Sequence, residues 1–528
     1  MKNIFSPALW AGIPLILTLL TACGSSGSGN SPVASANPSS SLIASSAVSV
    51  TASSIASSNV SIASSVASTN NSSSAASVAP ASSAISSPII SSSVSSLIVV
   101  QSSASSSAKI SSSSSAISSA SSALSKSSLS STSSSSTSSQ TNLAISSASS
   151  SSINGIVVSS AQEILNAVGN AKAGDVIYIH GGKYIFTAPI QLTANGTATS
   201  NIIFAAYPGD STRPLFDFSS MIEAASNRGL ELKGNYWHVK GIDVFHAGDN
   251  CMNISGSNNI VEHSTFSECA DTGLQLGGSA SNNTILNCDS FYNADSSLEN
   301  ADGFAAKLDV GTGNKFVGCR AWQNLDDGWD GYLRPSDNIT TTYENCWSFK
   351  NGYLKNGNLS AGDGNGFKTG GSDAVNGVKL LRHNAIYKGC IAAGNSADGF
   401  DHNSNRGEVT ILSCAAYNNG NNINFSATNP ASKLTIKNTI SVGTRGTQTA
   451  DVTNITNNSW QDGLAATSAD FLSVDISLLA SPRKADGSLP DINFLHLKPT
   501  SPLIDKGVDV GLPFNGSAPD LGAFETAP

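Results

Sequence analysis

Residues 288–293 read CDSFYN, a cysteine followed five residues later by an asparagine, and the same spacing recurs four more times along the chain. The other copies are CRAWQN from Cys319, CWSFKN from Cys346, CIAAGN from Cys390 and CAAYNN from Cys414. The asparagines are Asn293, Asn324, Asn351, Asn395 and Asn419. A fixed phrase at variable intervals is typical of a solenoid, in which each repeat contacts only its neighbours and differs from them in loop length.

Between these phrases lie short segments rich in β-forming residues, such as NKFVGC, TTYENC and VTILSC, separated by Asn, Gly and Ser. We therefore predict a right-handed parallel β-helix, an all-β solenoid in which equivalent residues of successive coils lie about 4.8 Å apart. The cysteines would form one column and the asparagines another. We expect buried free thiols, with Cys269 in a degenerate earlier copy, because parallel Cβ directions oppose the disulfide dihedral angle.

Both ends of the predicted solenoid carry signals that fit this fold. Ser160 and Glu163 form a capping-box pattern at the start of a short amphipathic segment, which predicts a helix that caps the N-terminal end. Near the C-terminus, SPLIDKG and DLGAFE resemble the closing segments of other parallel β-helix proteins.

The first 23 residues resemble an export signal, with Lys2, the apolar run ALWAGIPLILTLL and the ending LTAC at Cys23. This ending is similar to the bacterial lipoprotein signal, in which the cysteine is lipidated; the alternative is an ordinary signal peptide. The apolar run is shorter than the roughly 20 residues that a membrane span needs. We expect an outer-membrane lipoprotein, or a protein on the extracellular surface, of a Gram-negative bacterium, with a lipid as its only membrane contact.

Residues 24–152 are mostly Ser and Ala without an aromatic residue, and such a segment buries too little apolar surface to fold. We interpret it as a flexible low-complexity linker, with a glycosylated or sticky spacer as the alternative, followed by one folded domain over residues 153–528. The net charge of −9 and the absence of a basic stripe argue against a nucleic-acid partner. The seven histidines show no zinc-site spacing. We expect a monomer.

The residues that follow each asparagine align with one another as ADGFA ending at Ala305, DDGWD at Asp330, GNGFK at Lys368 and ADGFD at Asp401. Stacking of successive coils would then give three columns, which are Phe304, Trp329, Phe367 and Phe400; Asp302, Asp327, Asn365 and Asp398; and Ala305, Asp330, Lys368 and Asp401. The alignment brings together the carboxylates of Asp302, Asp326, Asp327 and Asp330.

Four carboxylates this close cannot all stay ionised without a cation. Oxygen ligands in a flexible cluster outside the cell favour calcium, Ca²⁺. The alternative is that these aspartates only form turns between strands, which we expect for Asp398. Lys368 lies beside the predicted ion, and both the ion's charge and desolvation would lower its pKa, which makes it a candidate base. Its alternative role is an ion pair with Asp330.

The stretches ADGFAAK, GCRAWQNLDDGWD and GNGFKTGG resemble polysaccharide lyase family 9, the pectate lyases with a ten-coil parallel β-helix. The resemblance implies that Asp302, Asp326, Asp327 and Asp330 are the primary Ca²⁺ ligands. It also implies that Lys368 is the base that removes a proton from C5 of a galacturonate in pectin or polygalacturonate. Three arginines are candidates to contact substrate carboxylates, because guanidinium pairs with carboxylate bidentately; these are Arg334, Arg382 and Arg406. Tyr332 is a candidate to line the cleft.

Three other functions are compatible with these residues. A pectin hydrolase would use Asp326 and Asp327 around a water, and would leave Lys368 without a role. A non-catalytic adhesin would use the aspartates for structural Ca²⁺. A rhamnogalacturonan I lyase would share the elimination chemistry and differ in the subsites that flank the catalytic centre.

Overall fold

The computed structural model of the chain describes residues 154–527. The predicted signal segment with Cys23 and the Ser/Ala-rich segment 24–152 lie outside the described residues, so the predictions for them stay predictions. Across residues 154–527, no helix has the length and apolar character that crossing a membrane requires.

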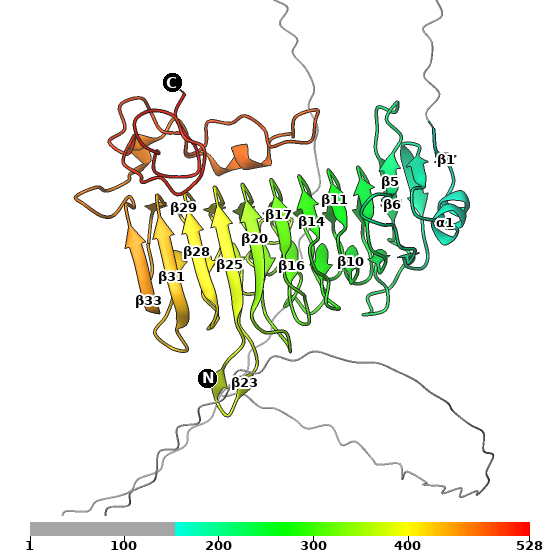
Figure 1. Cartoon of the computed structure of the whole chain (residues 1–528), viewed down its shortest axis with the longest axis horizontal. Helices are drawn as coiled ribbons and strands as arrows, with labels where there is room; N and C mark the ends of the chain where they lie inside the picture. The colour runs from blue at the N-terminus through cyan, green and yellow to red at the C-terminus, as the bar shows by residue number, and fades with distance from the viewer. Residues whose placement is uncertain (1–153, 528) are drawn as a thin grey trace, which may run out of the picture. The chain divides into compact units, whose positions relative to one another are not determined.

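Three long sheets, in which every neighbouring pair of strands is parallel, form the described part of the chain (Figure 1). Sheet A has 12 strands: β1 (Ile156–Val158), β2 (Val176–Ile179), β5 (Ile202–Ala206), β8 (Trp237–Lys240), β11 (Ile260–Glu262), β14 (Thr284–Leu286), β17 (Asn314–Val317), β20 (Ile339–Glu344), β25 (His383–Lys388), β28 (Glu408–Leu412), β31 (Ala431–Lys437) and β33 (Ala450–Thr456). Sheet B has 10 strands: β3 (Gly182–Ile185), β6 (Pro214–Asp217), β9 (Asp243–Phe245), β12 (Thr265–Ser267), β15 (Asp289–Phe291), β18 (Arg320–Trp322), β21 (Trp347–Phe349), β26 (Ile391–Ala393), β29 (Ala415–Tyr417) and β32 (Ile440–Val442). Sheet C has 9 strands: β4 (Ile190–Leu192), β7 (Leu230–Leu232), β10 (Met252–Ile254), β13 (Leu274–Leu276), β16 (Phe304–Ala306), β19 (Trp329–Asp330), β22 (Phe367–Lys368), β27 (Asp398–Asp401) and β30 (Asn421–Asn424).

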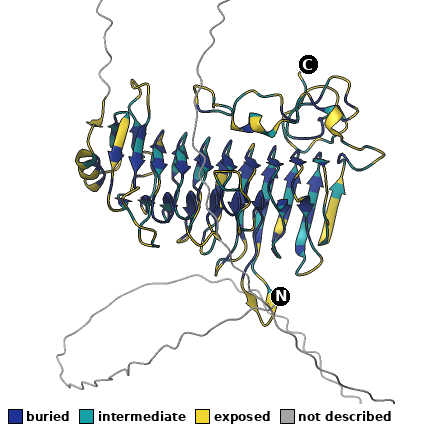
Figure 2. Cartoon of the chain, turned by 180° about the vertical axis from the view of Figure 1, so that it is seen from behind, coloured by how far each residue is buried: buried dark blue, intermediate teal, exposed yellow. Residues whose placement is uncertain are grey.

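From β2 to β32, apart from one inserted hairpin, the strands follow the sheet order A, B, C, so the chain passes through the three sheets once in each coil, as in β14, β15 and β16. This arrangement is a parallel β-helix and confirms the predicted solenoid. The only antiparallel strand pair among the described strands is the hairpin of β23 (Ala374–Val375) and β24 (Val378–Lys379), which projects from the coils (Figure 1). Figure 2 shows that the middle strands are buried, whereas β33 at the end of sheet A is exposed.

The predicted aromatic column occupies the core. The rings of Phe304, Trp329, Phe367 and Phe400 stack in that order, with centroid separations of 5.0, 4.8 and 5.1 Å. The strand register also pairs Ala305, Asp330, Lys368 and Asp401 in successive coils, as predicted. The sequence alignment therefore has the correct register.

The asparagine column is present and fully hydrogen-bonded. From Asn293 to Asn395 each buried amide donates from Nδ2 to Oδ1 of the asparagine in the next coil, at 2.9 Å for Asn293 to Asn324 and 3.0 Å for Asn351 to Asn395. The last one, Asn419, donates to Asn422. The same Oδ1 atoms accept the backbone N–H of the preceding asparagine. One side chain per coil therefore satisfies the buried backbone of a turn as well as the column.

Replacement of Asn351 by alanine is expected to lower the free energy of unfolding by about 1–3 kcal/mol, because it leaves the buried donors of Asn324 without their acceptor. Chemical denaturation would measure this loss. The exposed Asn358 is the matched control, and its replacement by alanine should have little effect. Equal losses in the two variants would contradict a structural role for the column.

The N-terminal end carries the predicted cap. Helix α1 (Ala161–Gly169) begins after Ser160, whose side chain accepts the N–H of Glu163, and Ile164, Ala167 and Val168 are buried against the first coil. The Glu163 carboxylate accepts the N–H of Ser159 and not that of Ser160, so the reciprocal half of the capping box is displaced by one residue.

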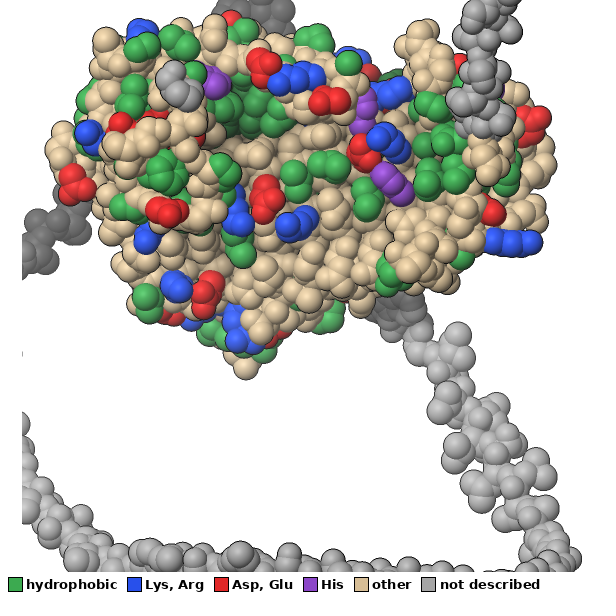
Figure 3. All heavy atoms as spheres, turned by 45° about the horizontal axis from the view of Figure 1, so that its top comes forward, with side chains coloured by type: hydrophobic (Ala, Val, Ile, Leu, Met, Phe, Trp, Pro, Cys, Tyr) green, Lys and Arg blue, Asp and Glu red, His purple; other side chains and the backbone are tan. Residues whose placement is uncertain are grey.

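The C-terminal segment has two short 3₁₀ helices, η1 (Ser468–Asp470) and η2 (Ile476–Ala480), and packs along sheet B with its own apolar core. Leu503 of SPLIDKG and Leu521 of DLGAFE are fully buried in this core, beside Ile391 and Ile440. The two phrases therefore belong to a segment that covers sheet B, whereas β33 at the end of the solenoid is exposed. On the face shown in Figure 3, Lys and Arg side chains lie among Asp and Glu side chains, and no continuous basic stripe crosses it.

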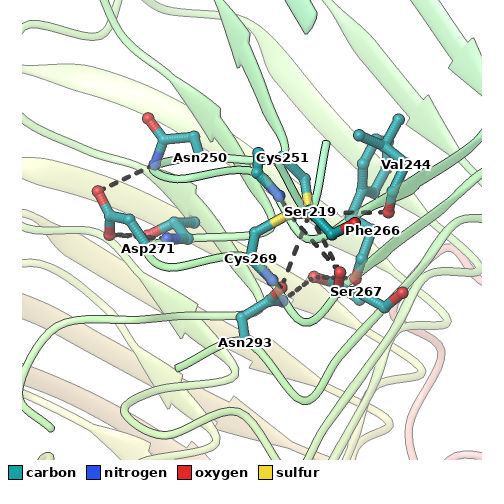
Figure 4. The surroundings of a disulfide bond; sticks show 12 residues. Ser219, Val244, Asn250, Cys251, Phe266, Ser267, Cys269, Asp271 and Asn293 are labelled. Atoms are coloured by element: carbon teal, nitrogen blue, oxygen red, sulfur yellow. Dashed lines mark hydrogen bonds between the residues drawn. A yellow bond between two sulfur atoms is a disulfide. The ribbon is translucent and has the colours of Figure 1, made fainter. Parts of the chain in front are cut away.

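The prediction of free thiols is correct for five cysteines and wrong for two. Cys288, Cys319, Cys346, Cys390 and Cys414 are buried and free, whereas Cys251 and Cys269 form a disulfide with a Cα–Cα distance of 5.5 Å (Figure 4). The N–H of Cys269 donates to Asn293 Oδ1, so Cys269 occupies the place of an asparagine in its coil. The argument from parallel Cβ directions does not apply to it, because it lies outside the cysteine column.

Candidate active site

The candidate site lies where sheet C presents its outward-facing residues in three successive coils. Strands β19 and β22 place Asp330 and Lys368 side by side. The turns that lead into β16 and β19 place Asp302 and Asp327 next to each other, and both are fully buried. Their backbone and side chains form a second ladder, in which Asp327 N–H donates to Asp302 Oδ1 and Asn365 N–H to Asp327 Oδ1.

One carboxylate oxygen from each of Asp302, Asp326 and Asp327 lies within 4.8 Å of the other two. Asp330 is buried beside this group and is joined to Asp302 through Lys307, whose Nζ lies 2.7 Å from Asp302 and 3.5 Å from Asp330. The structure therefore brings the four predicted aspartates together. Three of them form the tightest group.

Asp327 Oδ2 is buried and receives no hydrogen bond from the described residues. Lys368 Nζ lies 3.0 Å from it as an ion-pair partner, but not in hydrogen-bonding geometry. A buried carboxylate oxygen without a donor fits a position meant for a cation. Because all the donor atoms are carboxylate oxygens, the group fits Ca²⁺ better than a transition metal.

Three of the four carboxylates hold their protons more tightly than usual. Burial, only partly offset by Lys307, raises the pKa of Asp302 to about 7. Burial also raises the pKa of Asp326 to about 6, and it raises the pKa of Asp327 with help from the Asp326 charge. The pKa of Asp330 is lowered, since Lys368 and Lys307 outweigh its burial.

We expect the affinity for Ca²⁺ to rise with pH between 5.5 and 8. At pH 5.5 the carboxyls of Asp302 and Asp326 carry protons that the ion must displace, whereas at pH 8 they are ionised. Calorimetric titration at the two pH values, in two buffers of different ionisation enthalpy, would show that these carboxyls release more protons on Ca²⁺ binding at the lower pH. An affinity independent of pH would contradict binding at these carboxylates.

Lys368 is largely buried and lies among three carboxylates, with Nζ 3.0 Å from Asp327, 2.9 Å from Asp363 and 4.0 Å from Asp330. Burial alone would lower its pKa, but the charges of Asp327, Asp330 and Asp326 prevail and raise it. The surrounding carboxylates therefore favour the cationic form of Lys368. The predicted lowering of its pKa refers to the loaded site and stays a prediction.

Lys307 is a site residue that our sequence reasoning missed. It is largely buried, and besides Asp302 and Asp330 it lies 3.4 Å from the hydroxyl of Thr272. The signal was available, because Lys307 is two residues beyond Ala305 and side chains on a strand alternate with period two.

A groove of about 590 Å³ passes over this cluster. It is lined by the site residues Asp326, Asp330 and Lys368, by Lys307, and by other polar residues that include Arg228, Asp271, Tyr332, Arg334 and Asp363. Of the three predicted substrate arginines, only Arg334 lines it. Arg382 is paired with Asp337 at 2.7 Å, and Arg406 reaches Asp451 and the carbonyl of Pro430, so neither points into the groove.

Comparison with known proteins agrees with this architecture. The family model described as Pel9A-like, right handed beta helix region matches residues 143–439. Pectate lyase L of Dickeya dadantii is 36% identical over 370 residues, which cover 67% of this chain and 83% of that protein. Pectate lyase L of Paenibacillus polymyxa is 37% identical and covers 64% of this chain and 77% of its own length.

Two solved structures extend the comparison. The crystal structure of pectate lyase Pel9A superposes with a TM-score of 0.61 at 35% identity, covering 69% of this chain and 90% of that one. A rhamnogalacturonan lyase superposes with a TM-score of 0.56 at 28% identity, covering 64% and 91%. The matched family model also confirms the predicted right-handed coil. The chain therefore belongs to the Pel9A-like right-handed parallel β-helix family, polysaccharide lyase family 9, and is a polysaccharide lyase.

Proposed function

We propose that the protein is a Ca²⁺-dependent pectate lyase that cleaves α-1,4-linked polygalacturonate by β-elimination and leaves 4,5-unsaturated oligogalacturonides. The observation that carries the proposal is the position of Lys368 Nζ, 3.0 Å from a buried carboxylate cluster in the floor of an open groove. A hydrolase acting through Asp326 and Asp327 would not use this lysine.

Asp302, Asp326, Asp327 and Asp330 would hold Ca²⁺. When bound, the ion supplies positive charge that stabilises the carboxylate of the sugar as the neighbouring carbon loses its proton. The same positive charge would offset the carboxylates that now keep Lys368 protonated, and its pKa would fall. A neutral Nζ could then accept a proton.

The reaction balances without water. The C5–H bond breaks and its proton passes to the lone pair of Lys368 Nζ. The electron pair of that bond forms the C4–C5 double bond, and the bond from C4 to the leaving O4 breaks. The leaving oxygen takes up a proton from solvent and Lys368 later returns its own to solvent, so one chain becomes two, one of them unsaturated.

The relatives narrow the alternatives without deciding the substrate. Several curated relatives are named pectate lyases, and one similar structure is named a rhamnogalacturonan lyase.

We also propose that the protein is exported, with Cys23 as the lipidated residue, and that it acts as a monomer on pectin outside the cell. Incorporation of a labelled fatty acid into wild type but not into Cys23→Ser would test the anchor.

The test of function uses polygalacturonate and rhamnogalacturonan I in parallel, each with Ca²⁺ and with a chelator. Ultraviolet absorbance reports unsaturated uronates, and a reducing-sugar assay reports cleavage of any kind. We expect absorbance to rise on polygalacturonate only with Ca²⁺. Release of reducing sugar without a rise in absorbance would indicate a pectin hydrolase. No signal in either assay on either polymer would indicate a non-catalytic adhesin.

A further inference from the structure

A compact polar cluster lies at the edge of the groove beside Lys368, and two of its members, Tyr332 and Arg334, line the groove. We call Tyr332, Arg334, Asp373 and Lys379 the rim cluster. The Tyr332 hydroxyl donates to Asp373 Oδ1 at 2.6 Å, and Arg334 binds both oxygens of Asp373, at 2.5 and 2.8 Å. The Arg334 guanidinium lies 5.7 Å and the Lys379 ammonium 5.9 Å from the centre of the Tyr332 ring.

The rim cluster is fixed close to the reacting centre. Tyr332 follows Asp330, a proposed Ca²⁺ ligand, by two residues, and its backbone N–H donates to Asp330 Oδ1 at 3.0 Å. Leu333 forms an isolated parallel β-bridge with Ser372, which holds the segment that contains Arg334 beside the segment that contains Asp373. Lys379 comes from the hairpin of β23 and β24, which no other coil in residues 154–527 has.

The charges of the rim cluster do not cancel. The rim cluster holds two cations and one carboxylate, which leaves one positive charge beside a groove whose floor is acidic. Arg334 and Asp373 are 59% and 55% exposed, and an ion pair this exposed contributes little to stability. A carboxylate on a ligand could therefore replace Asp373 on the planar guanidinium, which binds carboxylates bidentately.

We propose that the rim cluster binds the carboxylate of a second galacturonate next to the bond that is cleaved, and so makes the enzyme select polygalacturonate over rhamnogalacturonan I. This inference rests on the proposed function. In polygalacturonate every sugar carries a carboxylate, whereas in rhamnogalacturonan I the sugars adjacent to a galacturonate are neutral rhamnose. A positive charge beside the catalytic centre discriminates between the two polymers, because it pairs with the carboxylate of an adjacent galacturonate and finds no partner on an adjacent rhamnose.

The test compares the double variant Arg334→Ala/Lys379→Ala with Arg382→Ala, which removes an exposed arginine–aspartate pair outside the groove. We expect the double variant to raise KM for polygalacturonate about 10-fold or more, with a smaller change in kcat, and so to lower the ratio of kcat/KM on polygalacturonate to kcat/KM on rhamnogalacturonan I. Arg382→Ala should behave as wild type. An unchanged KM in the double variant, or equal losses on both polymers, would overturn the inference.

A second variant separates recognition from support of the fold. Asp373→Asn weakens the hold on Arg334, so it should lower KM for polygalacturonate if Arg334 meets the substrate. If the rim cluster were only structural, Asp373→Asn would raise KM as the double variant does, and the proposal would fail.

Direct binding distinguishes failure of this inference from failure of the proposed function. Calorimetry with trigalacturonate and Ca²⁺, in the Lys368→Ala background to prevent cleavage, should show affinity that falls about 10-fold in the double variant. One outcome is that wild type shows no elimination while the double variant still binds trigalacturonate more weakly. In that case the proposed reaction is wrong, and the rim cluster is still a binding site for a uronate. If elimination occurs and the loss is absent, the uronate site fails alone.

Discussion

Replacement of Lys368 by alanine is expected to lower kcat on polygalacturonate by roughly 10²–10⁴-fold, the range typical of a lost general base. Lys368 Nζ is the one amine of the groove floor that lies within 4.0 Å of both Asp327 and Asp330 among the described residues. Initial rates followed by ultraviolet absorbance would measure the effect.

Lys368→Arg sharpens this experiment, because arginine keeps the positive charge and cannot give up its proton near neutral pH. If Lys368 acts as a base, both variants lose activity. If it only balances the charge of Asp327 and Asp363, Lys368→Arg retains activity and the base assignment is wrong. Both variants should keep the melting temperature of the Ca²⁺-loaded protein, and Lys368→Ala should bind Ca²⁺ more tightly because one cation has left the cluster.

Replacement of Asp327 by asparagine is expected to weaken Ca²⁺ binding by ~100-fold or more and to abolish activity at low Ca²⁺. The change removes a full charge from a buried position whose Oδ2 atom receives no hydrogen bond from the described residues. Calorimetric titration of Ca²⁺ reads out affinity independently of turnover. High Ca²⁺ should restore part of the activity.

Asp398 provides the matched control for Asp327, since it lies in the same column of the β-helix. Its carboxylate accepts hydrogen bonds from Asn421 at 2.8 Å and Asn424 at 2.6 Å, so its acceptors are satisfied within the protein. Asp398→Asn should leave Ca²⁺ affinity unchanged. A comparable loss of affinity in both variants would move the ion away from the proposed carboxylates.

The repeat made the columns predictable from sequence. A parallel β-helix places equivalent residues in adjacent coils, so the alignment that stacks Phe304 on Trp329 also brings Asp302 to Asp327. The prediction extended to sequence positions 40 or more residues apart in the chain because the register propagates from coil to coil. Lys307 follows the same logic, and we missed it only because the alignment ended at Ala305.

The parts that the repeat does not control were not predictable. Arg382 and Arg406 lie close in sequence to the repeated phrases, but each makes a local ion pair whose geometry depends on a loop. The Cys251–Cys269 disulfide arises where a coil departs from the phrase and places cysteine in an asparagine position. The rim cluster depends on an inserted hairpin, and a repeat carries no information about an insertion unique to one coil.

The last strand of sheet A, β33, is exposed, and it is the edge at which the strand of another copy of the protein would pair. Its outer edge presents backbone N–H and C=O groups in the spacing of one further coil, which is a template for end-to-end filament growth. The side chains on this strand oppose such growth, because Asp451, Thr453 and Asn454 are hydrophilic and only Val452 is a large exposed apolar residue. A solenoid whose final strand is polar can therefore end at any coil without exposing a large apolar edge.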